Sequence, residues 1–442
     1  MDGGGESNVS SLHRSQILRD LQSSPVHASG ETVNLWRDPK ARLILTANFL
    51  LVVGSGITWI AVPWLLIHQP NGTAIFGLSS SALTLLIFLL LPFLGKAIDR
   101  NSRKKVLFVY YVFALVTNLF VIAMILLRGR VETWHLIMSM SFGSLGVSLY
   151  YPAQFALNQE VLSKDQYRAL SGAIEVQWQS GAMIAGGLAT FLINRVPLAA
   201  ILVLDCCAYI GAFIVMSFVP YSRNPKLDAN TGSAWNLMIE GFAYLRNRPR
   251  LSLVLLGSFL PFLGVMVCVY LIPVFISNAL HAGPVVFGFA EVFYSFGAVL
   301  AGLTVPWLSG KIGLIRTLLL TVGCYTIASA VNPLYPAVAV FLGSLVAQGW
   351  GNAGSRVARS TVVLETVPNE VMGRVNLFYS ALERFLRAVL LAVVTHQVET
   401  SGARPGYWTI TGIGLCGWFM ILFCRRFRRR HAIPAAAPEK AV

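Results

Sequence analysis

The chain carries little charge for its length. Of its 442 residues only 12% are Asp, Glu, Lys or Arg, whereas 55% are hydrophobic. A soluble domain carries about a quarter charged residues, so this composition excludes an ordinary soluble protein. The apolar residues are gathered in runs of about 20, the length that spans the hydrocarbon core of a bilayer. The sequence therefore predicts a protein that crosses a membrane many times.

Motifs of several reaction classes are missing as well. The sequence contains neither a G-x-x-x-x-G-K-[ST] loop nor an H-E-x-x-H pair, and no stretch is suited to a separate soluble domain. The six Cys lie inside apolar runs without C-x-x-C spacing, which favours packed side chains over disulfides or metal ligands. We therefore expect no enzyme activity, no ATP-driven cycle, no metal and no cofactor.

The first forty residues are polar and Ser-rich and contain no apolar core, so we expect a tail rather than a signal peptide. Apolar runs separated by charged or Pro/Gly breaks then predict twelve membrane-spanning helices. The predicted spans are 43–67, 76–94, 106–127, 134–157, 170–194, 198–219, 251–276, 284–309, 315–331, 335–356, 375–398 and 406–424.

Lys and Arg residues are strongly biased to one side of this layout. Most of the 34 fall in the tails and in the connections after even-numbered spans, and Arg128, Arg130, Arg195 and Arg404 fall opposite. Positive charge marks the cytoplasmic side, so both termini are expected there. The basic run 425–430 resembles a nucleic-acid patch in composition. Its position directly after a span favours anionic lipid instead, and we expect no nucleic-acid partner.

The spans divide into two sets of six. The predicted organisation is a polar tail (1–40), a first half (41–219), a linker with an amphipathic helix (220–250), a second half (251–424) and a basic tail (425–442). Similar phrases close span 2 (91–96) and span 8 (305–311), which indicates a parallel repeat of two halves.

The loop after the second span carries a family signature. From Gly95 to Lys105 it reads GKAIDRNSRKK, which resembles the G-x-x-x-D-R-x-x-R-[RK] loop of the major facilitator superfamily. The resemblance covers about residues 35–425. It implies an all-α fold of two six-helix pseudo-repeat halves and a place in the bacterial inner membrane. The phrases at 151–153 and 168–172 are similar to the branch of enterobactin exporters and macrolide-efflux proteins.

In that family the loop is a conformational latch that holds the two halves together on the cytoplasmic side. Asp99 is suited to cap a helix start, and Arg100 or Arg103 to pair with an acid such as Glu160. The second copy has lost the acid, so we expect an asymmetric latch. The candidate latch residues are Gly95, Asp99, Arg100, Arg103 and Lys104.

The fifth span partly matches the export signature of the superfamily, through Gly181, Gly186 and Gly187 but without its proline. Ordinary packing of small residues explains these glycines equally well.

Ionisable residues inside the spans are the candidate substrate or proton-coupling residues, because charges at membrane depth are costly and rarely face lipid. Glu383 and Arg387 are four residues apart and share a helix face, so they are suited to pair. Arg384 needs another partner, either Glu291 or an anionic group of a substrate. The residues considered are Glu175, Glu291, Glu383, Arg384 and Arg387, with Asp205 interpreted as structural and accepting from a nearby hydroxyl or amide.

A closed ion-pair network without a ligand role is the alternative to a binding site. For the coupling proton, Glu175 is favoured over Glu383, since a carboxylate locked to an arginine does not titrate near neutrality.

The sequence therefore predicts a monomeric secondary transporter in contact with membrane lipids. The expected task is proton-coupled export of a small, partly anionic organic molecule, siderophore-like or drug-like, by an antiport mechanism of alternating access. The alternatives are an importer of an organic solute and a non-transporting sensor or enzyme on the same fold.

Overall fold

The computed structural model describes residues 37–162, 167–221, 234–367 and 369–430, and every regular element among them is a helix. The predicted all-α fold is therefore confirmed for the described part of the chain. The thirteen helices are α2 (Pro39–Ile67), α3 (Gly72–Arg100), α4 (Arg103–Arg128), α5 (Thr133–Val161), α6 (Tyr167–Leu192), α7 (Leu198–Ser217), α8 (Ala234–Arg246), α9 (Pro249–Asn278), α10 (Pro284–Ile312), α11 (Leu314–Leu334), α12 (Val338–Thr366), α13 (Asn369–Ser401) and α14 (Arg404–Arg430).

The long helices lie at the predicted spans, but several extend further, most of all α3, α12, α13 and α14. We predicted the end of the tenth span at residue 356, whereas α12 continues to Thr366. No proline follows until Pro368, and the apolar pattern resumes after the arginines, so nothing stops the helix earlier. Likewise α14 continues to Arg430, through the segment expected to be a tail.

Eight helices are long and apolar enough to cross a membrane by their length and composition. The other four long helices, α5, α6, α12 and α13, have 26 to 33 residues but carry more polar and charged side chains. Twelve spans therefore remain a prediction, of which the apolar criterion supports eight. The polar residues of these four helices are tolerated at depth where they face other helices rather than lipid.

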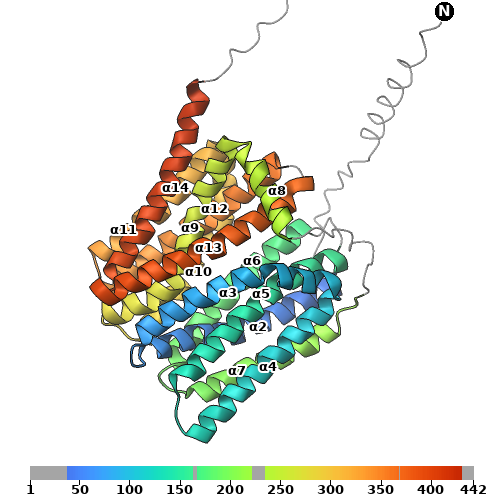
Figure 1. Ribbon diagram of the computed structural model, residues 1–442, viewed down its shortest axis with the longest axis vertical. Coiled ribbons are helices and arrows are strands. Elements are labelled where there is room, and N and C mark those ends of the chain that lie inside the picture. Colours follow the sequence, from blue (N-terminus) through green and yellow to red (C-terminus); the bar gives the residue numbers. More distant parts are fainter. Residues whose placement is uncertain (1–36, 163–166, 222–233, 368, 431–442) are drawn as a thin grey trace, which may run out of the picture.

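The long helices form two bundles, α2–α7 and α9–α14 (Figure 1). In the first bundle α2 packs on α6 and α7, and α4 packs on α5 and α7. In the second, α12 packs on α10 and α11, and α14 packs on α9 and α11. The bundles meet chiefly along two helix pairs, α6 with α10 and α3 with α13, which run side by side in Figure 1.

Helix direction defines two ends of the molecule. We call the end at which α2 begins and α14 ends the terminal face, and the other end the far face.

Specific contacts between the bundles gather toward the far face. Trp64 of α2 meets Phe287 of α10 with ring centroids 5.9 Å apart, and His68 contacts Ser277 at the end of α9. Phe76 of α3 meets Tyr270 at 5.3 Å.

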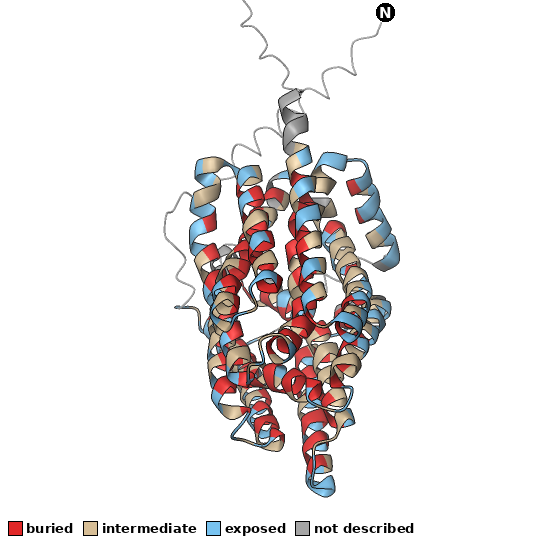
Figure 2. Cartoon of the chain, turned by 90° about the vertical axis from the view of Figure 1, so that its left-hand side faces the viewer, coloured by how far each residue is buried: buried red, intermediate tan, exposed pale blue. Residues whose placement is uncertain are grey.

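The exterior of the bundles is apolar. Leu126, Leu127, Leu303, Trp307 and Ile327 are all more than 60% exposed. Figure 2 shows buried residues on the inward faces of the helices and exposed ones along their outer sides. In water such patches would promote association, so they are suited to contact lipid tails.

The short helix α8 lies where the linker was predicted to be amphipathic. It packs mainly on α13, through an ion pair of 2.8 Å between Glu240 and Arg374 and ring contact between Phe242 and Phe378. Its Trp235 meets Phe88 of α3 with centroids 5.8 Å apart. The helix therefore touches both bundles on the terminal-face side.

Candidate functional site

A cluster of charged side chains lies at the middle of α13. Glu383 and Arg387 form the ion pair predicted from their spacing, with 3.9 Å between Oε1 and Nη1. The same guanidinium reaches the sulfur of Met266 on α9 at 3.8 Å. Both side chains are largely buried, so each compensates much of the other's desolvation cost.

Arg384 lies beside this pair without a counter-charge of its own. It is fifteen residues from the start of α13 and seventeen from its end, and among the described residues it forms no ion pair. One turn further along, the carbonyl of Ala388 accepts a hydrogen bond of 2.6 Å from Ser81 of α3. Arg384 therefore sits at mid-depth, close to the boundary between the bundles.

Glu291 does not pair with Arg384. It lies seven residues from the start of α10, about 10 Å from the far-face end at 1.5 Å per residue, whereas Arg384 is about 25 Å from that end. Glu291 instead packs against α6, where a Cβ on Gly186 would lie 3.0 Å from its Cβ. The structure thus separates two charged groups that the sequence allowed to be partners.

Sequence reasoning missed Arg359 as an interior residue, because the predicted tenth span stopped too early. Its Nη1 donates to the Ser258 carbonyl at 2.9 Å, and its guanidinium lies 5.4 Å from the centre of the Phe259 ring. Tyr379 of α13 packs on the same ring at 5.5 Å. The apolar run Val362–Leu364 after the arginine was the signal that the helix continues.

Arg359 adds positive charge to the second bundle. Its side chain and that of Arg387 contact α9 two helical turns apart, at Ser258 and Met266. Arg384 of α13 and Arg356 of α12, whose Nε is buried, bring the interior guanidinium groups on these two helices to four. Against them the described acids are Glu383 of α13 and Glu291 of α10, so the described bundle interior has a local excess of cation.

Polar groups near Glu291 bond to one another within the bundle, although Asn352 Oδ1 has no hydrogen-bond partner among the described residues. The Asn352 amide donates to the Tyr294 hydroxyl at 2.7 Å, and Gln348 donates to Ser344 at 3.2 Å. Such a network fixes helix packing and also presents polar atoms at depth.

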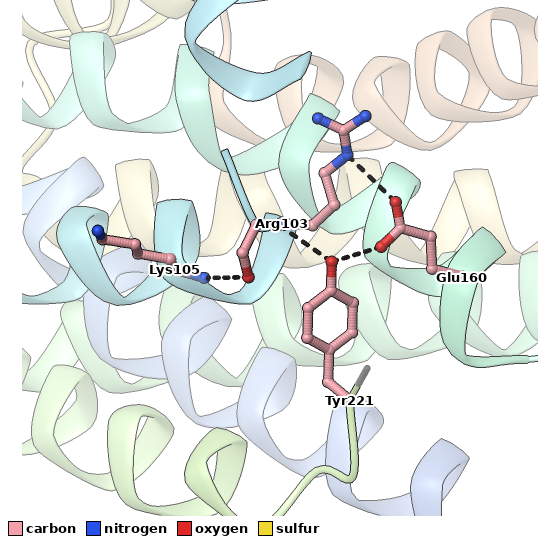
Figure 3. A network of polar contacts seen from close by, with 5 residues as sticks. Arg103, Lys105, Glu160 and Tyr221 are labelled. Carbon is pink, nitrogen blue, oxygen red and sulfur yellow. Dashed lines mark hydrogen bonds and ion pairs between the residues drawn. The ribbon is translucent and has the colours of Figure 1, made fainter. Parts of the chain in front are cut away.

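The latch region forms a network inside the first bundle. Arg103 Nε lies 3.5 Å from Glu160 Oε1, which confirms the expected acid partner. Figure 3 shows that the Tyr221 hydroxyl lies between them: it donates to Glu160 and accepts from the backbone N–H of Arg103 at 3.3 Å. Burial and the hydrogen bond to Glu160 both raise the pKa of Tyr221, so the phenol keeps its proton. The start of α4, the end of α5 and the segment after α7 are thereby joined.

Lys104 strengthens the same junction. Its ammonium donates to the carbonyls of Ser217 and Val219 at 2.9 and 2.8 Å, where α7 ends. Cations near a helix C-terminus are stabilising because of the helix dipole. The N-cap of α4 is Ser102, whose hydroxyl accepts from the Lys105 N–H at 3.4 Å.

Several candidate side chains lie outside the described part of the structure. These are Gly95, Asp99 and Arg100 of the latch and Glu175 of α6, which the structure places in helices without describing their surroundings. Their predicted roles stay predictions.

The glycines of α6 differ in their surroundings. A Cβ on Gly186 would lie 2.7 Å from the Gly288 carbonyl of α10, and a Cβ on Gly181 would lie 2.5 Å from a methyl of Val52 on α2. At Gly187 nothing lies within 4 Å. Gly186 therefore permits the close approach of the two bundles, and Gly187 does not take part in it.

Two bundles of long helices, with an apolar exterior and charged groups at mid-depth near their boundary, define a membrane transporter for small molecules. The family profile described as Major Facilitator Superfamily matches residues 44–330 and 254–442. The chain belongs to this superfamily, as its latch loop suggested.

Individual relatives are distant. Macrolide efflux protein A of Streptococcus pyogenes is 23% identical over 278 residues, which make up 62% of this chain and 67% of that protein. The nucleoside transporter NupG superposes with a TM-score of 0.67 at 14% identity, covering 88% of this chain and 99% of its own.

A bacterial homologue of the iron transporter ferroportin is similar in fold as well. In its inward-facing state it gives a TM-score of 0.67 at 16% identity, with 87% of this chain and 98% of that one covered. In its outward-facing state the TM-score is 0.57.

Proposed function

We propose that this transporter exports a bulky, partly anionic organic molecule, siderophore-like or drug-like, in exchange for protons. The observation that carries the proposal is the excess of arginine inside the second bundle, above all Arg384 at mid-depth without an ion pair in the described chain. A buried guanidinium is costly without a partner, and a substrate carboxylate, phenolate or hydroxamate supplies one.

The direction of transport rests on likeness. The relative named macrolide efflux protein A supports export of a large organic compound, and the glycines of α6 partly match the export signature. Aromatic residues beside Arg359 in the second bundle, such as Tyr379 and Phe259, suit the apolar body of such a compound.

The proposed topology follows from the charge asymmetry. The terminal face is cytoplasmic, because Lys and Arg concentrate there, and the membrane is a bacterial inner membrane. The two halves are 41–219 and 251–424, joined by the linker 220–250 and flanked by the tails 1–40 and 425–442. The working unit is a monomer, since one chain supplies both halves.

Alternating access is the proposed mechanism. Contacts between the bundles gather toward the far face, so the structure corresponds to a state closed on the outside. Opening there requires α6 to separate from α10 and α3 from α13. Glu291 lies at the first of these contacts, and Glu175 lies on the same helix as Gly186, so both are proposed to carry coupling protons.

The proposal is tested by accumulation in a bacterial strain that lacks its own efflux pumps. Expression of the chain should lower the intracellular level of a macrolide or of an anionic siderophore several-fold, and a protonophore should abolish the effect. An Arg384→Ala variant expressed to the same level in the membrane serves as the control. Higher accumulation on expression would show import, and an effect insensitive to the protonophore would contradict proton coupling.

A further inference from the structure

A second buried acid lies in the first bundle, away from the arginines. Asp205 of α7 is only 3% exposed. Its Oδ1 accepts from the Ser55 hydroxyl of α2 at 2.8 Å, and its Oδ2 accepts from the Asn118 amide of α4 at 3.0 Å. The expected hydroxyl and amide donors are thus both present, and the carboxyl group joins three helices.

No cation accompanies this acid. Among the described residues Asp205 forms no ion pair, and the helices packed on α7, namely α2 and α4, face it with neutral groups. The titratable groups around it are the phenols of Tyr209 and Tyr110 and the thiol of Cys206. A purely structural acid at this depth would ordinarily be matched by an arginine or lysine, as Glu383 is.

The carboxyl group also lines a cavity. The cavity measures about 80 Å³ and lies between α2, α4, α5 and α7. Besides Asp205 its wall includes the polar groups of Ser55 and Asn118, and it reaches Phe76 of α3 and Val269 of α9 at the bundle boundary. Most of the cavity wall is apolar, but Asp205, Ser55 and Asn118 together offer a water molecule several polar partners, and such a water gives the acid a route for proton exchange.

We infer that Asp205 is a proton-binding carboxyl group of the transport cycle, loaded and unloaded through this cavity. The inference rests on the proposed proton coupling and names a residue for it in the first bundle. The carboxylate takes one proton from water and becomes a neutral acid, and it returns the proton to water on the other side of the membrane. Neutralisation removes the cost of holding an unpaired charge away from solvent.

Protonation has a structural consequence at this junction. The ionised carboxylate accepts from Ser55 and Asn118 and so ties α2 and α4 to α7. The neutral acid carries a donor of its own, and one of these contacts must change. Helix α2 also carries Trp64 and His68, which contact the second bundle at the far face. A change in the hydrogen bond between Ser55 and Asp205 therefore acts on the same helix that makes this far-face contact.

Infrared spectroscopy of the purified full chain in lipid nanodiscs tests this without a substrate. Difference spectra across pH about 5 to 9 should contain carbonyl stretching bands of protonated carboxyl groups, and Asp205→Asn should remove one band that Glu291→Gln and Glu175→Gln leave in place. Glu383→Gln is the matched control: it alters a buried but ion-paired acid and should leave the band. Ser55→Ala removes a donor to the ionised form, so the midpoint should move up by about one pH unit.

Two outcomes overturn the inference. One is a set of bands that Asp205→Asn leaves unchanged, and the other is that the band lost in Asp205→Asn does not change with pH in the wild type. If Asp205→Asn fails to fold, an unchanged midpoint in Ser55→Ala decides against Asp205. If Asp205 binds a proton but the chain shows no export activity, the proposed function is refuted while the proton-binding site is supported. Failure of the proposed function can therefore be told apart from failure of this inference.

Discussion

At the scale of single residues, Arg384 and Arg387 lie within one turn of α13 but have different surroundings. Arg387 has Glu383 within 3.9 Å and contacts Met266. Arg384 has no such partner in the described chain, and its position near the bundle boundary is the basis for proposing that its guanidinium binds a ligand. Arginine presents a planar fork of donors that matches a carboxylate in two-point contact, which a lysine does not.

Arg384→Lys should therefore weaken binding of an anionic substrate about tenfold, because a single point charge replaces two parallel hydrogen bonds. The neutral ester of the same substrate should lose no more than two- or three-fold. Equilibrium binding to the purified protein, measured for both forms, checks this. Arg195→Lys, in a far-face loop, is the control, and equal losses for acid and ester would show that Arg384 is structural.

At the scale of helices, the closed far side depends on small residues. Gly186 and Gly288 bring the backbones of α6 and α10 together, and a Cβ on Gly186 would lie 2.7 Å from the Gly288 carbonyl. Backbone atoms cannot turn away as a flexible side chain can, so any larger residue must push the helices apart. In the proposed cycle this contact is present in one state and is lost when the far side opens.

Gly186→Val should for this reason shift the population toward the outward-open state. A penalty of about 1.4 kcal/mol would change the ratio of the two states tenfold. The measurement is the rate at which an impermeant maleimide, added from the far side, labels Ser81→Cys at the α3–α13 contact, with the native cysteines replaced. Gly187→Val is the matched control, since nothing lies within 4 Å of it. Equal labelling rates in both variants would refute this role of Gly186.

At the scale of the whole molecule, charge and fold together set the orientation. The basic residues concentrate on the terminal face, whereas the far face holds only short connections such as that between Arg128 and Thr133. Moving this many positive charges across a bilayer is unfavourable, which supports the proposed cytoplasmic location of the terminal face.

Arg130→Cys in a far-face loop should therefore be labelled by an impermeant maleimide in intact cells, and Asn247→Cys beside α8 only after the cells are permeabilised. Both positions are exposed in the structure, so access to the thiol reports on the side of the membrane. Labelling of Asn247→Cys in intact cells would reverse the proposed orientation. The cysteine-free parent protein measures background reaction.

The local pattern of apolar and charged residues along the sequence was enough to predict much of the fold. Apolar run length placed the long helices, and residue spacing predicted the pair Glu383–Arg387 and the amphipathic α8. The extent of α12 was misjudged because arginines were taken as the end of a span. Their positions inside the helix depend on neighbours, here the Ser258 carbonyl and the Phe259 ring, that compensate a buried guanidinium.

The sequence by itself determined that this protein is a helical membrane transporter with the loop signature of its superfamily, because hydrophobic length, charge bias and the loop motif are local properties of the chain. Only the tertiary structure decided which charged groups on different helices meet. It separated Glu291 from Arg384, joined Arg103, Glu160 and Tyr221, and surrounded Asp205 with neutral donors. The physical reason is that partners of a buried charge come from other helices, and helix packing sets their depth and facing.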